Sequence, residues 1–94
     1  DIDCSTSNYF TKTIAANSTF TFSNPPASGT AFAFTLEVTH TSGTITWPTT
    51  VRWPGGTAPT LTSTASRSDM FVFYTNTAGT TWYAMTAAQN FVTT

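Results

Sequence analysis

The chain has 94 residues and a formal net charge of −1, a length that suits one domain rather than two. Only 7% of its residues are charged, against about 25% in an average domain, and no basic stripe is present that could bind nucleic acid. No apolar run is long enough for membrane insertion. We therefore expect a single domain over residues 1–94, with neither nucleic acid nor membrane as a partner.

Period-two alternation of apolar and polar residues runs through the first half of the chain and predicts β-strands. In chain order, short alternating segments cover 10–14, 19–22 and, most clearly, 31–39, and the pattern returns at 44–47. The apolar side of the longest segment, together with two residues further on, is the predicted core: Phe32, Phe34, Leu36, Val38, Val72 and Phe73.

The second half continues the same pattern. Segment 69–75 is apolar on both faces, as expected of a central strand covered on both sides, and 80–85 is its predicted hairpin partner. Turn residues at 24–29, 41–43, 53–56 and 76–79 separate the strands, with hairpin turns predicted at 41–43 and 76–79. We therefore predict an all-β fold, an antiparallel, jelly-roll-like β-sandwich of about six to eight short strands.

The residues that could perform acid–base or metal chemistry are few and scattered. The carboxylates are Asp1, Asp3, Glu37 and Asp69, with one histidine, His40, which we expect to have a structural hydrogen bond beside a turn. No carboxylate pair, nucleophile-elbow motif or metal-ligand spacing is present, so we predict no enzyme activity, no metal and no cofactor. The lone Cys4 cannot form a disulfide within the chain, which suits folding in a reducing cytosol.

A tryptophan–proline segment over 47–62 is the most specific feature of the sequence. Three prolines remove backbone donors from it, so we predict an extended crossover rather than an ordinary strand. Within it, Val51 should point to the core and Arg52 to solvent or to Glu37. Trp47 and Trp53 either wedge between two sheets, the interpretation we prefer, or form a platform on which a sugar stacks. The candidate residues for binding a glycan or a partner are Trp47, Trp53, Trp82 and Tyr83.

These features together resemble a module of marine tailed phages, especially cyanophages, found near the end of tail-fibre or other virion appendage proteins. The resemblance spans nearly the whole chain and rests on Asp3-Cys4, Asn8-Tyr9-Phe10, Asn24-Pro25-Pro26 with Gly29, segments 34–38 and 47–61, Phe73-Tyr74-Thr75 and Gly79-Thr80-Thr81-Trp82-Tyr83. It implies a virion protein, assembled in the host cytoplasm and commonly a homotrimer. That family has an acidic residue in the last hairpin turn, where this chain has Asn76 and Thr77, which argues against a metal site there.

The leading hypothesis is therefore a non-enzymatic structural module of a phage tail fibre or other appendage, a piece of a longer virion protein. Other virion proteins would be its partners, and it could contribute to host attachment through a host-surface glycan. Two alternatives stay open: a capsid decoration or cement protein, and a carbohydrate-binding module of a secreted bacterial protein. A nearly uncharged surface lowers the desolvation cost of association, so we expect a homo-oligomer, a trimer, built through small faces: Ala31, Ala33 and Thr35, or Thr19 and Thr21.

Overall fold

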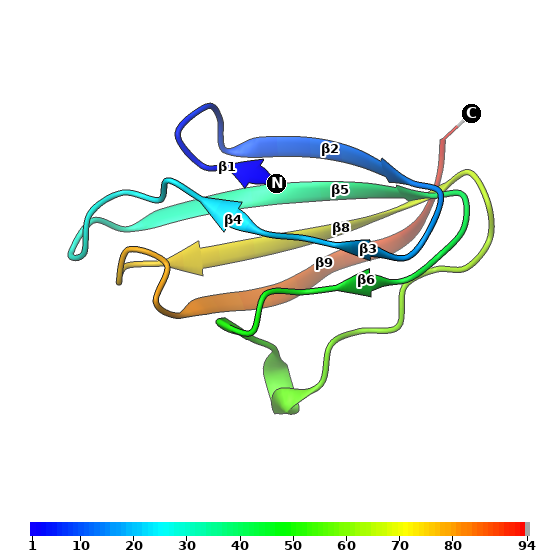
Figure 1. The fold of residues 1–94 in the computed structure, drawn as a ribbon. Coiled ribbons are helices and arrows are strands. Elements are labelled where there is room, and N and C mark those ends of the chain that lie inside the picture. The colour runs from blue at the N-terminus through cyan, green and yellow to red at the C-terminus, as the bar shows by residue number, and fades with distance from the viewer. Residues whose placement is uncertain (94) are drawn as a thin grey trace.

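Residues 1–93, described by a computed structural model, form strands joined by turns and loops (Figure 1). Their helical content is one short 3-10 turn, η1, and no helix among these residues is long and apolar enough to cross a membrane. In chain order the elements are β1 (Ile2–Asp3), β2 (Tyr9–Ile14), β3 (Ser18–Thr19), β4 (Phe22–Ser23), β5 (Phe32–His40), β6 (Ile45–Thr46), β7 (Val51–Arg52), η1 (Pro54–Gly56), β8 (Arg67–Thr75) and β9 (Trp82–Val92).

The main sheet has five strands in the order β2-β5-β8-β9-β7. Its central strands β5, β8 and β9 are antiparallel, and the predicted hairpin at 76–79 joins the last two. At both edges the pairing is parallel, β2 with β5 and β7 with β9. The sheet is therefore mixed, and the prediction of a purely antiparallel arrangement is wrong. The reason lies in the connections, because parallel neighbours require a crossover between them, and residues 15–31 and 53–81 supply two.

Short strands form a partial layer over one face of this sheet, in front of it in Figure 1. Here β1 pairs with β4 and β3 pairs with β6, both in parallel. The turn at 41–43 therefore does not close the hairpin that we predicted. It leads the chain from β5 out of the main sheet and into β6. Tertiary contacts explain the difference: the Thr41 amide donates to the Ile14 carbonyl at 2.9 Å, and Gly43 lies against the backbone of Ala16.

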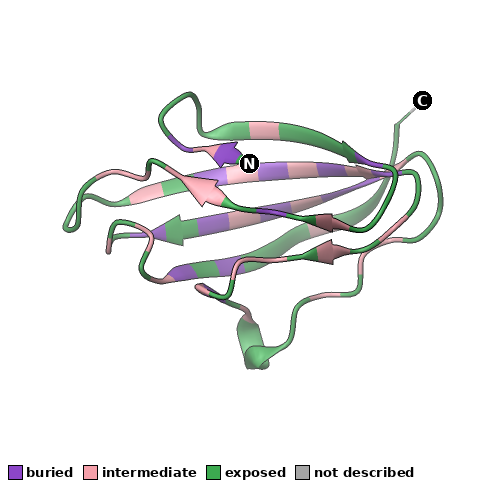
Figure 2. Cartoon of the chain, in the orientation of Figure 1, coloured by how far each residue is buried: buried purple, intermediate pink, exposed green. Residues whose placement is uncertain are grey.

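The core lies between the main sheet and the short strands, and buried positions alternate along β5 and β8 (Figure 2). Phe34, Leu36, Val38 and Phe73 are fully buried, as predicted. Phe22, from the short-strand layer, packs edge-on against both Phe34 and Phe73, with ring centroids 5.0 Å apart in each pair. Phe32 is half-buried and packs against this core, next to Phe34 and Trp82. The prediction was wrong for Val72, which lies half-buried on the opposite face of the sheet.

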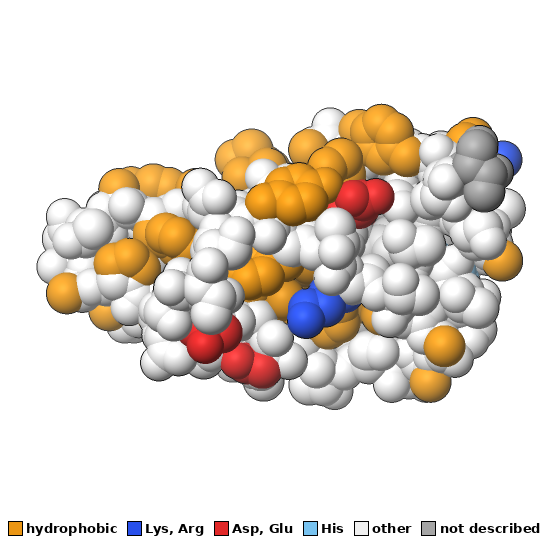
Figure 3. Space-filling model, turned by 90° about the horizontal axis from the view of Figure 1, so that it is seen from above, with side chains coloured by type: hydrophobic (Ala, Val, Ile, Leu, Met, Phe, Trp, Pro, Cys, Tyr) orange, Lys and Arg blue, Asp and Glu red, His pale blue; other side chains and the backbone are white. Residues whose placement is uncertain are grey.

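The opposite face of the main sheet is not covered by any element of residues 1–93. Figure 3 looks down on the sheet from its β2 edge, and hydrophobic side chains gather along the border that lies behind the sheet in Figure 1. The expectation that β8 is covered on both faces is therefore wrong for these residues. We call this uncovered side the outer face.

A buried carboxylate joins β8 to two neighbouring segments. Asp69 is 1% exposed, and it accepts hydrogen bonds from the Thr62 amide (2.7 Å), the Gln89 side chain (2.9 Å) and the Asn90 amide (2.9 Å). It lies where the β8–β9 register shifts, between Ser68 and Phe71. Burial raises the pKa of Asp69, but the donors from Thr62, Asn90 and Gln89 together outweigh it and hold the pKa below its ordinary value.

We expect Asp69→Asn to lower the free energy of unfolding at pH 7 by about 2–3 kcal/mol, because an amide cannot accept all three hydrogen bonds. A carboxyl whose folded pKa is depressed stabilises the fold above its unfolded pKa, about 3.9. That stability is lost as the pH falls through the folded pKa. Urea unfolding at pH 7, 5 and 3 should therefore show a difference between the two proteins that shrinks at the lowest pH.

The matched control is Asp1→Asn, since the Asp1 carboxylate is exposed and bonded only to the hydroxyls of Thr21 and Ser23. It should have the smaller effect at pH 7. A difference between Asp69→Asn and the unmodified chain that stays constant from pH 7 to pH 3 would contradict the assignment of a stabilising ionised carboxylate.

Candidate functional site

Tyrosine and methionine side chains are concentrated on the outer face. The chain has 3 Tyr and 2 Met, and strand registers place all five on this face. Tyr74 is directly opposite Tyr83, Val72 is opposite Met85, Met70 is opposite Glu37, and Tyr9 is opposite Thr35. By contrast, all three tryptophans lie on the core side of the sheet.

These side chains are exposed despite their size. Tyr83 is 54% exposed and Met85 49% exposed, and Tyr9, Tyr74 and Phe91 are also exposed. Phe91 belongs to the outer face because it is opposite Ser68, which is opposite Thr39. Of the large hydrophobic side chains exposed among residues 1–93, every one except Val92 lies on the outer face. A concentration of this kind on one surface is typical of an interaction site, whereas scattered exposed hydrophobics are ordinary.

The outer face has little charge. Glu37 is on β5, and its Oε1 accepts a hydrogen bond from the Tyr9 hydroxyl at 2.8 Å, which raises the pKa of Tyr9. Arg52 is on β7, opposite Tyr83, is exposed as predicted, and donates from Nη1 to the Thr49 carbonyl at 3.0 Å. The two charges are separated by β8 and β9, so the predicted option of an Arg52–Glu37 contact within one chain is wrong.

The four predicted binding aromatics do not form one platform. Trp82 is 2% exposed and belongs to the core. Trp47 and Trp53 are half-buried, meet edge-to-face at 5.5 Å, and pack on Phe71 between the sheet and the chain segments in front of it. Tyr83 lies on the other side of the sheet. The arrangement matches the wedge interpretation for Trp47 and Trp53.

Four exposed outer-face residues, Tyr9, Tyr74, Met85 and Phe91, were not among the predicted site residues. The signal for Tyr74 was present in the sequence, because segment 69–75 is apolar on both faces. We interpreted this pattern as a central strand covered on both sides, and the structure shows that residues 1–93 cover one side only.

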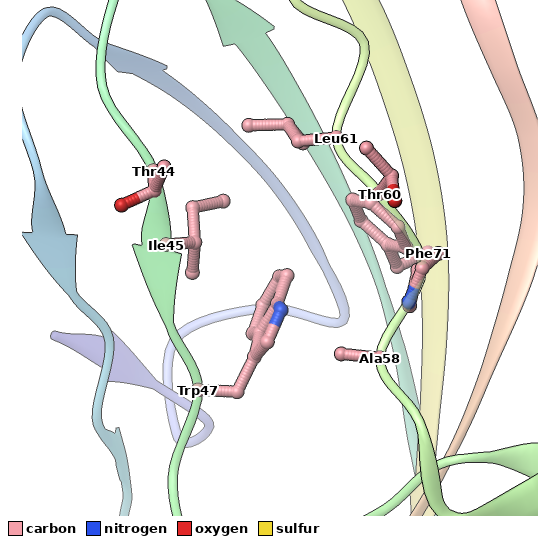
Figure 4. Close-up of a pocket in the computed structure, with 8 residues that line it drawn as sticks. Thr44, Ile45, Trp47, Ala58, Thr60, Leu61 and Phe71 are labelled. Carbon is pink, nitrogen blue, oxygen red and sulfur yellow. The ribbon is translucent and has the colours of Figure 1, made fainter.

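A cavity of about 230 Å³ opens between β6 and the extended segment 57–62. In Figure 4, Ile45 of β6 and Trp47, just after it, lie on one side, Ala58, Thr60 and Leu61 lie on the other, and Phe71 forms the floor. Most of its lining is apolar, and none of it is charged: Thr44, Ile45, Trp47, Ala58, Pro59, Thr60, Leu61 and Phe71. We call this feature the groove.

Two titratable side chains, His40 and Cys4, are buried. Nε2 of the buried His40 lies 2.9 Å from the Gly43 carbonyl oxygen, a structural bond of the kind predicted, and Nδ1 has no partner within residues 1–93. Burial and the nearby Asp3 charge raise the pKa of the Cys4 thiol to about 11, so it is protonated near neutral pH. Across the described part of the chain, no group of three His, Cys, Asp or Glu side chains is placed to hold a metal ion.

No protein-family model, no curated protein sequence and no solved structure matches this chain. The outer face and the groove, which lie on opposite sides of the main sheet, are therefore the two features from which a function can be inferred. The first is broad and aromatic, and the second is narrow and follows a strand edge.

Proposed function

We propose that this chain is a non-catalytic structural module of a phage virion appendage that self-associates through its outer face. One observation carries the proposal: nearly all of the large hydrophobic side chains that the described residues leave exposed lie on a single, uncovered sheet face. Aromatic residues and Met are enriched at protein interfaces, and charged residues are depleted from their centres. The virion setting comes from the sequence resemblance.

The position of the two outer-face charges favours a head-to-tail ring of copies. Glu37 is near one side of the face, on β5, and Arg52 is at the other side, on β7. When the β2–β5 side of one copy meets the β9–β7 side of the next, each Glu37 faces an Arg52 of its neighbour. Head-to-tail contacts close into a ring when the rotation between neighbouring copies closes, and the resemblance to appendage modules suggests a ring of three.

The small residues expected at the interface belong to the same surface. Ala33 lies opposite Tyr74, and Thr35 lies opposite Val72, so both are on the outer face. Thr19, in β3, and Thr21, between β3 and β4, lie on the short-strand side and form the alternative that we do not favour. The finer fold assignment, a jelly-roll-like β-sandwich, is also part of this proposal, with β1, β3, β4 and β6 as its second layer.

The proposal predicts that Ala33→Lys dissociates the assembly. A charged side chain placed within an apolar interface must be desolvated without a partner, which is unfavourable by several kcal/mol. Light scattering over a wide concentration range should give the unmodified chain three times the 10.1 kDa mass of one copy. The Ala33→Lys variant should give the mass of one copy.

Ala27→Lys is the matched control, because Ala27 is also exposed but lies in the loop before β5. It should leave the mass unchanged, and circular dichroism should show that both variants fold. An unmodified chain that is monomeric at every concentration would overturn the proposal and favour a monomeric sugar-binding module. An oligomer that is unaffected by Ala33→Lys would show that another surface forms the contact.

A further inference from the structure

Both methionines of the chain lie on the outer face. Met85 is opposite Val72, and Met70 is opposite Glu37. Met85 is 49% exposed, and Met70 is half-buried. The core of residues 1–93 contains no methionine, since its members are aromatic and aliphatic side chains together with Cys4. A reagent that attacks thioether sulfur therefore changes the outer face and leaves the core side chains as they are.

The only other sulfur atom of the chain is protected from oxidation. Cys4 is 5% exposed, and burial and the nearby Asp3 charge raise the pKa of its thiol to about 11. The thiolate is the form of cysteine that oxidants attack, and at neutral pH almost all of Cys4 is the thiol. Among the sulfur groups, Met85 is therefore the one that an oxidant in solution reaches first.

Oxidation would change the chemistry of the outer face at Met85. Hydrogen peroxide transfers one oxygen atom to a thioether: the sulfur lone pair forms the S–O bond, the O–O bond breaks and water is released. The sulfur is oxidised by two electrons and the peroxide is reduced. The product, methionine sulfoxide, is polar where the thioether was apolar. Its neighbour across the sheet, Val72, has no side-chain donor to offer the new oxygen.

The position of Met85 connects this chemistry to self-association. Met is a residue enriched at protein interfaces, and Met-rich interfaces are disrupted by sulfoxide formation. When the outer face is buried against a second copy, the sulfoxide oxygen must be desolvated without a partner, which is unfavourable. In the single copy, by contrast, the sulfoxide remains in water and costs nothing.

We propose that the oxidation state of Met85 controls self-association through the outer face. Copies that carry the thioether associate, and copies that carry the sulfoxide stay single. This control rests on the proposed function, because it acts on the interface described there. Peroxide acts on the free copy, in which Met85 is exposed, and it therefore prevents association. Methionine sulfoxide reductases, one for each sulfoxide epimer, reverse the change.

The test uses the whole chain, treated with hydrogen peroxide at a protein concentration low enough to keep it dissociated. The peroxide is then removed, mass spectrometry locates the added oxygen, and light scattering over a concentration range measures association. We expect oxidation of Met85 to raise the dissociation constant about tenfold or more, because a buried polar group is left without a partner. Treatment with both reductases should restore the original value. Circular dichroism should not change, since the core of residues 1–93 contains no methionine.

Two matched variants assign the effect to one sulfur atom. Met85→Leu keeps an apolar side chain of similar volume and should associate equally well before and after peroxide. Met70→Leu keeps Met85 and should still respond to peroxide. A response in Met85→Leu equal to that of the unmodified chain would contradict the role of Met85.

The untreated chain separates this proposal from the proposed function. If the untreated chain assembles and the chain oxidised at Met85 assembles equally well, the redox control is wrong and the outer-face interface stands. If the untreated chain is monomeric at every concentration, the proposed function fails and the redox control fails with it. Loss of the β-sheet signal on oxidation would also overturn the redox control, because dissociation would then follow from unfolding.

Discussion

Phe34→Ala is expected to lower the free energy of unfolding by about 3–5 kcal/mol, the usual loss for a buried Phe. Phe34 is 1% exposed and stacks on Phe73 with ring centroids 5.0 Å apart. Phe10, Phe22 and Trp82 pack edge-on around it. These four neighbouring rings come from four different strands, and two of the rings are on the β8–β9 hairpin. Because the strands hold them in place, the rings cannot readily move into the space left by the missing Phe34 ring.

The measurement is urea unfolding, carried out in the Ala33→Lys background so that association does not contribute to the apparent stability. Phe91→Ala is the control, because it deletes the same atoms from a side chain that is 42% exposed. It should have a clearly smaller effect. A loss below about 1 kcal/mol for Phe34→Ala would mean that the core has been assigned wrongly.

Gly43→Ala is expected to destabilise the fold by at least about 2 kcal/mol more than Gly29→Ala. Both glycines have positive φ angles, 94° and 91°, so both variants carry a backbone strain of about 1–3 kcal/mol. They differ in their surroundings. A Cβ at Gly43 would overlap the carbonyl group of Ala16 and lie 2.6 Å from the Asn17 nitrogen, whereas a Cβ at Gly29 would have nothing within 4 Å.

The same unfolding experiment separates strain from steric overlap, because the difference between the two variants cancels the shared φ contribution. The clash should also disturb His40, whose Nε2 bonds to the Gly43 carbonyl oxygen, and so shift the ring signals of His40 in Gly43→Ala alone. Equal losses in the two variants would show that the 41–43 turn is not packed against the connection after β2.

Local patterns were sufficient to predict the elements whose partners are near in sequence. The alternation over 31–39 predicted β5, and the turn at 76–79 predicted the β8–β9 hairpin. The parallel pairing of β2 with β5 could not be predicted, since alternation defines the faces of a strand but not its neighbour or direction. The hairpin predicted at 41–43 failed for a related reason: Gly43 is fixed by Ala16, a residue far away in the chain.

The candidate site was predictable only in part. Tyr83 was among the expected binding residues and does lie on the outer face, but Trp82 was included on residue type alone and is buried. The apolar side chains on the outer face of β8 predict that this face is buried, but they do not indicate which segment or partner covers it. Either the chain itself or a partner can cover such a face, and the sequence pattern is the same in both cases. The groove had no sequence signal, because it arises where β6 and segment 57–62, each extended, fail to pair.

Hydroxyl-radical footprinting at low and high protein concentration tests most directly whether the outer face is buried by self-association. Tyr83 and Met85 report on the outer face, and the half-buried Trp53, on the other side of the sheet, is the reference. If copies pack through the outer face, oxidation of Tyr83 and Met85 should fall severalfold as concentration rises, while oxidation of Trp53 stays constant. Unchanged oxidation of Tyr83 and Met85 across a concentration range in which the mass increases would contradict the proposed interface.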